Sequence, residues 1–307
     1  MQWLHNNDSK VKQSLTLDQG DGHMWQESGF TNLDSDELRA FMDERKEADY
    51  VLVDVRQPGE YTGGHIPGAK HVPLGKLEDA LTKGEFKSDR AHVFYCAGGV
   101  RSRAASRLAV ESGLFAKGVF NLDKGFRGWN GMALPDSPRL KIFEDAKSVE
   151  DMLVRALGLE KAAHYFYKTI SESSDNTILC ELMARLVDME MAHARMVYKQ
   201  LEMLKGDVPP FEEMFEAAPA DVLEGGRTLK DLKPWIESAK SGDCLELAEL
   251  GMEIEFSAFD LYRALANETD TPAIERIFLS LAEEEKKHVR LLFKNLDGFL
   301  DPEVCCP

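Results

Sequence analysis

Two stretches of the chain carry the same metal-ligating residue types at the same spacing. Glu190 and His193 lie three residues apart in "LVDMEMAHARMVYKQL", and Glu285 and His288 repeat this spacing in "LAEEEKKHVRLLFKNL". The chain has eight histidines, and only these two follow a glutamate by three residues. Residues i and i+3 share one face of a helix, so each pair would present a carboxylate and an imidazole together.

The repeat extends beyond these pairs with a constant offset of 95 residues, since Glu160 corresponds to Glu255 as Glu190 does to Glu285. Asp175 and Asp270 lie midway between the acidic residues of each copy, in the turn-like stretches "SESSDN" and "ANETDTP". A chain reversal at these points would return both acidic residues of a copy to the same height on adjacent antiparallel helices.

Two such hairpins would bring four carboxylates and two imidazoles into one buried centre. The six residues are Glu160, Glu190, His193, Glu255, Glu285 and His288. Unpaired charges in a bundle core are costly, so we expect them to ligate metal. Two glutamates plus two Glu-x-x-His pairs on four helices form the di-iron or di-manganese carboxylate arrangement. We expect two metal ions per chain, and these ligand types suit either iron or manganese without choosing between them.

A plainer interpretation is that these residues are solvated surface charges left by an old duplication. His164 follows Glu160 by four residues and could be read as a further ligand, but Phe259 takes its place in the second copy. We therefore expect His164 to be a core histidine or one that lies behind the ligands.

A second candidate site is the stretch "FYCAGGVRSRAAS", in which Cys96 ends an expected strand and Arg101 opens an expected helix. The two glycines between them let backbone N–H groups curl toward the sulfur. These amides, the helix N-terminus and Arg101 would bind an anion and lower the thiol pKa. We predict Cys96 and Arg101 as catalytic residues. The predicted substrate-binding loop is Ala97, Gly98, Gly99, Val100 and Arg101. The alternative is a buried cysteine at a strand end.

The elements that must position these residues differ between the two halves of the chain. In the first half, β-rich runs alternate with helical stretches, which predicts an α/β unit with a mainly parallel sheet. The β-rich runs are 50–55, 70–74, 92–96 and 118–122, and the clearest helical stretches are 34–45 and 101–113.

After Pro138 the pattern becomes all-helical. Long helical patterns lie near 148–172, 176–204, 243–267 and 272–298. The Pro- and Gly-containing segment between the second and third predicts a long crossover, and so a ferritin-like four-helix bundle. The predicted organisation is a polar N-terminal arm (1–29), the α/β domain (30–142), the bundle (147–300) and a C-terminal tail (301–307).

Composition excludes several classes of protein. A formal net charge of −17 opposes nucleic-acid binding, and no run has the 18 apolar residues of a membrane span. The start lacks a secretory signal, so we expect a cytoplasmic protein. The five cysteines form no C-x-x-C pair, which excludes a rubredoxin or zinc-ribbon module. Cys305 and Cys306 are interpreted as idle thiols of the tail.

Residues 147–300 resemble the rubrerythrin branch of the ferritin-like di-iron proteins. "EKAAHYFY" and "EFSAFDLY" are similar to its first and third helices, and "MEMAH" and "EEKKH" to its second and fourth. The resemblance implies hydroxyls of Tyr167 and Tyr262 near the metals, and reduction of hydrogen peroxide or oxidation of ferrous iron. Rubrerythrins usually carry a further glutamate where this chain has Ala258. The missing rubredoxin module implies an external electron donor.

Residues 30–142 resemble a single-domain rhodanese. "VDVRQPGEYTGGHIPGAKHVP" and "LDKGFRGWNGMALP" are similar to its two signatures. The six-residue loop matches sulfurtransferases, whereas related phosphatases have one residue more. The resemblance implies transfer of sulfane sulfur through a Cys96 persulfide, from a small donor such as thiosulfate or polysulfide to a thiol acceptor. It also implies that Asp54, Arg56 and His65 belong to structural turns.

These observations predict a sulfurtransferase fused to a di-iron oxidoreductase that reduces peroxide or oxygen. The alternative is a di-iron peroxidase or ferroxidase whose rhodanese domain only binds or delivers a sulfur-containing partner. A third class is iron storage, which needs a cage-forming oligomer. We expect a homo-oligomer with no nucleic-acid or membrane partner.

Overall fold

The computed structural model describes residues 29–223, 225–238 and 244–299. Its N-terminal part is an α/β unit around a five-stranded sheet of order β1-β5-β4-β2-β3. The strands are β1 (Thr31–Leu33), β2 (Tyr50–Asp54), β3 (Lys70–His71), β4 (Ala91–Tyr95) and β5 (Val119–Leu122). All four strand pairings are parallel, which confirms the predicted α/β class.

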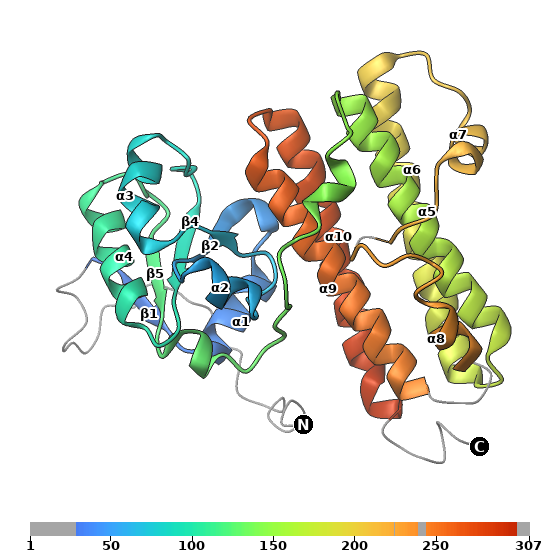
Figure 1. The fold of residues 1–307 in the computed structure, drawn as a ribbon, viewed down its shortest axis with the longest axis horizontal. Coiled ribbons are helices and arrows are strands. Elements are labelled where there is room, and N and C mark those ends of the chain that lie inside the picture. Colours follow the sequence, from blue (N-terminus) through green and yellow to red (C-terminus); the bar gives the residue numbers. More distant parts are fainter. Residues whose placement is uncertain (1–28, 224, 239–243, 300–307) are drawn as a thin grey trace.

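Helices cover both faces of this sheet. They are α1 (Ser35–Glu44), α2 (Pro58–Thr62), α3 (Leu74–Thr82) and α4 (Val100–Glu111). Side chains of successive strand residues point to opposite faces. Accordingly, Val51 and Val53 join the apolar cluster under α3 and α4, while Tyr50 and Leu52 join the cluster under α1 and α2. Figure 1 shows the two helix pairs on opposite sides of the sheet.

Two local predictions in this unit are wrong or incomplete. The run at 70–74 is a strand only over Lys70–His71, because α3 begins at Leu74 directly after Pro73. Proline carries no N–H for a sheet, and it is tolerated at the start of a helix. Strand β1 was not predicted, since three residues give too little pattern without their partner β5.

The C-terminal part is a bundle of two long antiparallel hairpins. Its helices are α5 (Val149–Ser173), α6 (Thr177–Lys205), α9 (Cys244–Glu268) and α10 (Pro272–Phe299). The side chains of Ser148 and Asn176 accept backbone N–H groups at the starts of α5 and α6, 3.1 and 2.9 Å away. The crossover from α6 to α9 carries α7 (Phe211–Ala217) and α8 (Lys233–Ser238). The ferritin-like bundle is confirmed.

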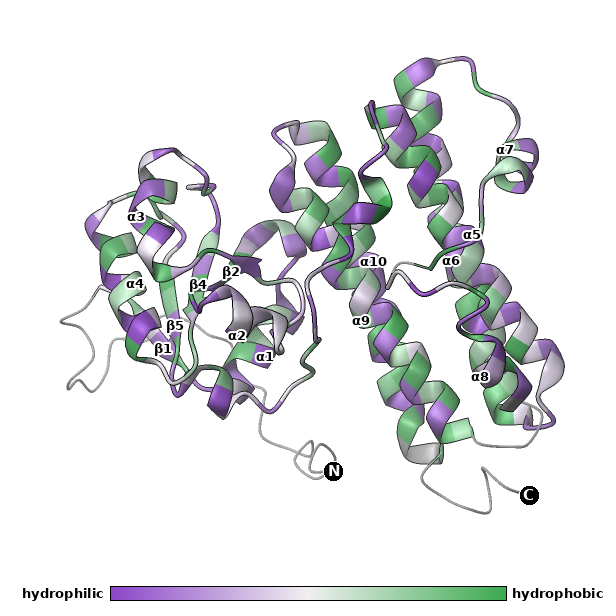
Figure 2. Ribbon diagram, viewed as in Figure 1, coloured by the Kyte–Doolittle hydropathy of each residue, from purple (hydrophilic) through white to green (hydrophobic). Residues whose placement is uncertain are grey.

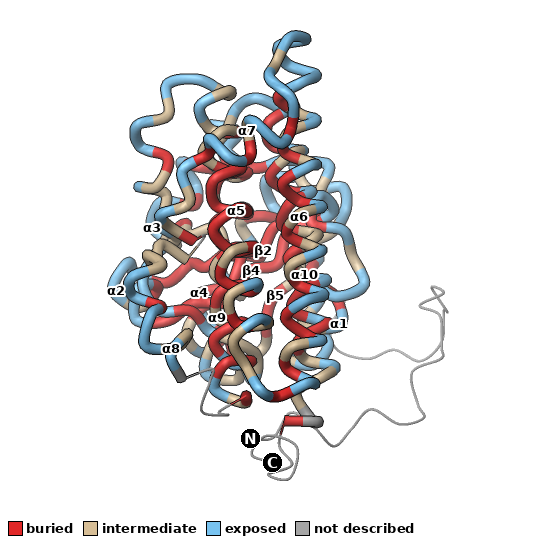
Figure 3. The backbone as a smooth tube through the Cα atoms, turned by 90° about the vertical axis from the view of Figure 1, so that its right-hand side faces the viewer, coloured by how far each residue is buried: buried red, intermediate tan, exposed pale blue. Residues whose placement is uncertain are grey.

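The long helices are amphipathic, and their apolar sides face each other. Figure 2 shows apolar and polar residues alternating along each helix, and Figure 3 shows buried stripes on α5, α9 and α10. Two apolar clusters fill the bundle, one at each end, so the polar residues between them lie in a closed interior. None of the described helices has the length and apolar content that crossing a bilayer requires.

Candidate functional site

The four bundle helices bring the six residues of the repeat into one buried cluster. Helix α5 supplies one glutamate and α9 another, while α6 and α10 each supply a glutamate and a histidine. Their exposed fractions are 3% or less: Glu160, Glu190, His193, Glu255, Glu285 and His288. We call these six residues the carboxylate–histidine cluster.

His193 on α6 faces carboxylates from three helices. Its Nδ1 lies 3.3 Å from Glu160 Oε2, 3.5 Å from Glu190 Oε2 and 3.4 Å from Glu285 Oε1. The imidazole therefore lies between both hairpins.

His288 on α10 has the matching environment. Its Nδ1 lies 2.8 Å from Glu255 Oε2, 3.3 Å from Glu190 Oε1 and 3.2 Å from Glu285 Oε2. The rings of His288 and His193 stack in parallel with centroids 4.5 Å apart. Glu190 and Glu285 thus face both imidazoles, whereas Glu255 faces one. The internal repeat appears in space as two equivalent halves.

Two buried tyrosines tie the halves together. The Tyr167 hydroxyl on α5 donates to Glu255 Oε1 on α9, and the Tyr262 hydroxyl on α9 donates to Glu160 Oε1 on α5. Each tyrosine therefore orients a carboxylate of the other hairpin.

The four buried glutamates have different pKa values: two are raised and two are lowered. Burial raises the pKa of Glu160 to about 7 and that of Glu255 to about 8. Burial is also the largest single effect on Glu190 and Glu285 and raises their pKa, but the charges and hydrogen bonds of His288 and His193 together outweigh it and lower the pKa of both. Ionised carboxylates in such a place need a positive partner.

The atoms of the cluster fit a metal site. Among the described residues, Glu160 Oε2, His193 Nδ1 and Glu285 Oε1 are buried without a hydrogen-bond partner. Buried polar atoms are rarely left without a partner, and a bound metal ion is one way to supply it. These three residues form a group whose ligand atoms lie within 4.8 Å of one another, as do Glu255, Glu285 and His288. Carboxylate oxygens with imidazole nitrogens suit iron or manganese.

His164 and Ala258 lie near the cluster in sequence but do not join it. His164 Nδ1 lies 3.2 Å from the Val187 carbonyl oxygen, and its ring contacts Phe215 of α7. Ala258 packs in the apolar cluster at one end of the bundle.

In the α/β unit, Cys96 lies between β4 and α4 and is 2% exposed. The Gly99 N–H donates to the Cys96 sulfur at 3.1 Å, and the Ser102 hydroxyl does so at 3.5 Å. Gly99 has φ 89°, a conformation that glycine adopts without strain. Burial raises the pKa of the Cys96 thiol, but hydrogen bonds from Ser102 and the loop N–H groups lower it further than burial raises it. The loop therefore favours thiolate.

Arg101 is held by a residue outside the loop. Its Nη1 and Nη2 form a bidentate ion pair with Glu60 of α2, at 2.7 and 2.6 Å. The guanidinium lowers the pKa of the Glu60 carboxyl to about 2. Both side chains are about one third exposed, at 33% and 36%, so an incoming anion can compete with Glu60 for Arg101.

Sequence reasoning missed Glu60 and Ser102. Glu60 lies 41 residues from its partner, a separation that no local pattern bridges. Ser102 had a usable signal, because it lies in the first turn of the helix that follows the cysteine loop. Of the predicted turn residues, Arg56 pairs with Asp54 at 2.7 Å, while His65 contacts Asp260 of the bundle.

The cysteine loop rests on the turn Gly125–Gly128. The carbonyl oxygens of Cys96 and Ala97 accept N–H groups of Phe126 and Arg127 at 2.7 and 3.0 Å. A Cβ on Gly125 would lie 2.2 Å from the Cys96 carbonyl oxygen, so this position admits only glycine.

Gly125→Ala should therefore displace the cysteine loop and lower the free energy of unfolding by about 1–3 kcal/mol, the usual cost of overpacking. Gly113→Ala is the matched control, because Gly113 also has positive φ but has no atom within 4 Å of an added Cβ. Chemical denaturation measures the stability of both variants. Formation of thiocyanate from thiosulfate and cyanide, the sulfur transfer expected of Cys96, reports on the position of the loop. Equal losses in the two variants would show that the close approach to Cys96 is unimportant.

Comparisons with known proteins agree with both halves. The family model "Rhodanese-like domain" matches residues 34–132, and the model "Rubrerythrin" matches residues 246–304. The second match covers the α9–α10 hairpin, and the internal repeat extends the same ligand pattern to α5 and α6.

Several relatives match the N-terminal half. "Uncharacterized protein YqhL" of Bacillus subtilis is 39% identical over 80 residues, which are 26% of this chain and 60% of that protein. "Thiosulfate sulfurtransferase GlpE" of Pseudoalteromonas translucida is 32% identical over 81 residues, 26% of this chain and 73% of that protein. A solved rhodanese-like domain protein of Staphylococcus aureus is 28% identical, with a TM-score of 0.31, and covers 35% of this chain and 100% of its own.

The chain thus spans less than two thirds of YqhL but nearly three quarters of the sulfurtransferase. Through residues 34–132 the chain belongs to the rhodanese family, and it continues into a rubrerythrin domain, so that it is a rhodanese–rubrerythrin fusion.

Proposed function

We propose that the rhodanese-like domain is a sulfurtransferase that carries sulfur on Cys96. The Cys96 thiolate attacks the outer sulfur of thiosulfate, the S–S bond of thiosulfate breaks, and sulfite leaves with the electron pair. An acceptor thiolate then attacks the terminal sulfur of the Cys96 persulfide, and the Cys96 thiolate is released. Both steps conserve charge and need no oxidant.

The loop geometry supports this assignment. The Gly99 N–H and the Ser102 hydroxyl stabilise the thiolate, and Arg101 offers a cation to an anionic donor. The relative named as a thiosulfate sulfurtransferase supports thiosulfate as donor, with polysulfide as the other candidate. Val100 is 78% exposed, so the cysteine loop lies at the surface of the domain.

We further propose that the carboxylate–histidine cluster holds two iron ions. Four ionised carboxylates carry four negative charges, and two divalent cations would neutralise them while both imidazoles stay neutral ligands. All six residues of the cluster would hold the ions, and Glu190 and Glu285 each face both histidines.

The iron pair, when bound, would supply the electrons that reduce hydrogen peroxide or oxygen. The chain's own residues hold the ligands in place: Tyr167 and Tyr262 orient two of the carboxylates, and the apolar clusters at both ends exclude water. An electron donor outside the chain would restore the ferrous state. We propose the cytoplasm as the compartment of both activities.

One observation carries the proposal: each candidate site is complete within its own domain. The six ligands all lie on α5, α6, α9 and α10, whereas Cys96 and its hydrogen-bond donors lie in the α/β unit. A site whose functional residues all come from one domain should keep its activity when the site in the other domain is inactivated by mutation.

Stopped-flow oxidation of the ferrous protein tests this independence. Cys96→Ser should be oxidised by hydrogen peroxide within a few-fold of the wild-type rate, and Glu190→Ala should keep sulfur transfer. Oxygen is run in parallel, because the alanine at position 258 is expected to slow the reaction with peroxide relative to oxygen. Loss of peroxide oxidation in Cys96→Ser at full metal content would instead make the Cys96 persulfide the electron donor.

A further inference from the structure

The α/β unit lies against the outer side of α9 and α10, which separate it from α5 and α6 (Figure 1). Polar contacts join the α/β unit to α9 and α10 at several positions along these helices. His65 Nε2 lies 3.0 Å from Asp260 Oδ2 on α9. Arg90 Nη2 lies 2.8 Å from Glu275 Oε1 at the start of α10, and Arg290 on α10 donates to Asp43. Each of these ion pairs engages one helix of the bundle.

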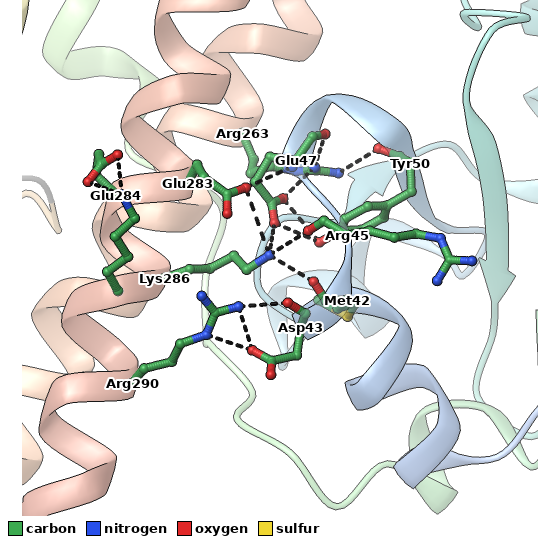
Figure 4. Close-up of polar contacts among 11 residues, drawn as sticks. Met42, Asp43, Arg45, Glu47, Tyr50, Arg263, Glu283, Glu284, Lys286 and Arg290 are labelled. Carbon is green, nitrogen blue, oxygen red and sulfur yellow. Dashed lines mark hydrogen bonds and ion pairs between the residues drawn. The ribbon is translucent and has the colours of Figure 1, made fainter. Parts of the chain in front are cut away.

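Glu47 differs, because its carboxylate binds both helices. Its Oε2 accepts from Arg263 Nη1 on α9 at 2.6 Å, and its Oε1 accepts from Lys286 Nζ on α10 at 2.7 Å. The Tyr50 hydroxyl donates to both oxygens. The main chain adds two contacts: the Glu47 carbonyl accepts from Arg263 at 2.9 Å, and the Glu47 N–H donates to Glu283 at 3.0 Å. Figure 4 shows these side chains converging between the domains.

The two cations that Glu47 binds are sequence neighbours of the carboxylate–histidine cluster. Arg263 follows Tyr262, whose hydroxyl donates to the ligand Glu160, and Lys286 follows the ligand Glu285. One residue along a helix is a rotation of about 100°. A rotation of α9 or α10 that released Glu47 would therefore also turn the cluster residues away from the bundle centre.

We propose that Glu47 of the rhodanese-like domain is a positioning residue for the carboxylate–histidine cluster, and that it acts through Arg263 and Lys286. The inference rests on the proposed metal-binding function of the cluster. By joining α9 to α10 on the side away from α5 and α6, Glu47 fixes the rotation of one helix relative to the other. The rhodanese-like domain is then part of the support of the metal site.

The burial of Glu47 and Arg263 explains why removing the negative charge of Glu47 should shift the neighbouring helices. Glu47 is 1% exposed and Arg263 is 2% exposed. A buried cation that loses its partner is strongly destabilised, and it recovers solvation only if the surrounding helices shift. Arg263 cannot reach water without moving the helix turn that carries Tyr262. Lys286 is 13% exposed and would keep the Met42 and Arg45 carbonyls as its remaining partners.

Cobalt(II) binding by the full-length protein tests the proposal, with its visible absorption reporting on ligand geometry. Glu47→Gln should bind cobalt at least about tenfold more weakly than wild type, as groups that orient metal ligands typically do when replaced. Its cobalt spectrum should also change. Glu275→Gln is the control, because it removes another buried carboxylate that pairs across the interface, ten residues before Glu285. The control should keep wild-type affinity and spectrum.

Lys286→Met is a second variant that tests the same proposal if Glu47→Gln does not fold. It removes the Lys286 ion pair with Glu47 and the Lys286 hydrogen bonds to the Met42 and Arg45 carbonyls. The Arg263–Glu47 pair stays, so the variant should show the same shift in smaller measure. Wild-type cobalt affinity and spectrum in whichever of the two variants is folded would overturn the role of Glu47. A wild-type protein that binds no cobalt would instead overturn the proposed metal site itself.

Discussion

Cys96→Ser should abolish the transfer of sulfur from thiosulfate to cyanide. A serine hydroxyl does not ionise in the physiological pH range and forms no persulfide, so neither half of the reaction remains. The loop that lowers the pKa of Cys96 would stay in place, because its contacts to the turn Gly125–Gly128 use backbone atoms. Thiocyanate formation measures the loss, and mass spectrometry after thiosulfate treatment measures the missing persulfide.

Cys180→Ser is the control for this prediction. Cys180 is the other free cysteine among the described residues. It lies in the first turn of α6, and its sulfur contacts the carbonyl of Ser174 at the end of α5, far along the chain from the cysteine loop. Its replacement should leave thiocyanate formation unchanged. Wild-type activity in Cys96→Ser, or a matching loss in Cys180→Ser, would contradict the assignment of the nucleophile.

His193→Ala should have the largest effect on the bundle. The substitution removes an imidazole that faces Glu160, Glu190 and Glu285. Glu160 then keeps only the Tyr262 hydroxyl, and Glu190 and Glu285 keep only His288 as a facing imidazole. Removing one partner of a buried ion pair typically costs about 3–5 kcal/mol. We expect the bound metal to fall by at least half and the bundle to unfold at lower denaturant concentration.

His164→Ala separates ligand loss from cavity formation. Both histidines are buried on bundle helices, but His164 contacts the Val187 carbonyl and Phe215 and not the cluster. Its loss should lower stability while the metal content stays at the wild-type level. Full metal content in His193→Ala would show that this imidazole is not a ligand.

The bundle could be predicted closely, because its signals are local or periodic. The predicted helix at 148–172 is Val149–Ser173 in the structure, and the one at 272–298 is Pro272–Phe299. Capping residues mark the helix starts, and amphipathic periodicity marks their lengths. The constant offset of the repeat then placed the six predicted metal-binding residues at one height in the bundle, without any knowledge of side-chain positions.

The contacts that join distant segments could not be predicted. Glu47 and Arg263 are 216 residues apart, and neither carries a signal that names the other. The same holds for Glu60 and Arg101. Short elements such as β1 were missed because three residues acquire their conformation from the strand beside them.

The contacts between the domains limit how far the metal site is independent of the rhodanese-like domain. No ligand of the carboxylate–histidine cluster comes from the rhodanese-like domain among the described residues, yet Glu47 ties that domain to both helices of one hairpin. Chemistry at Cys96 is therefore expected to be separable from the metal site, whereas removal of the whole rhodanese-like domain is not expected to leave that site intact.

The central claim is that four glutamates and two histidines of one chain hold a pair of iron ions. Metal analysis of the wild-type protein, purified without oxygen and supplied with ferrous iron, tests it most directly. We expect two iron ions per chain, which would neutralise the four carboxylates. Less than one ion per chain in correctly folded protein would contradict it.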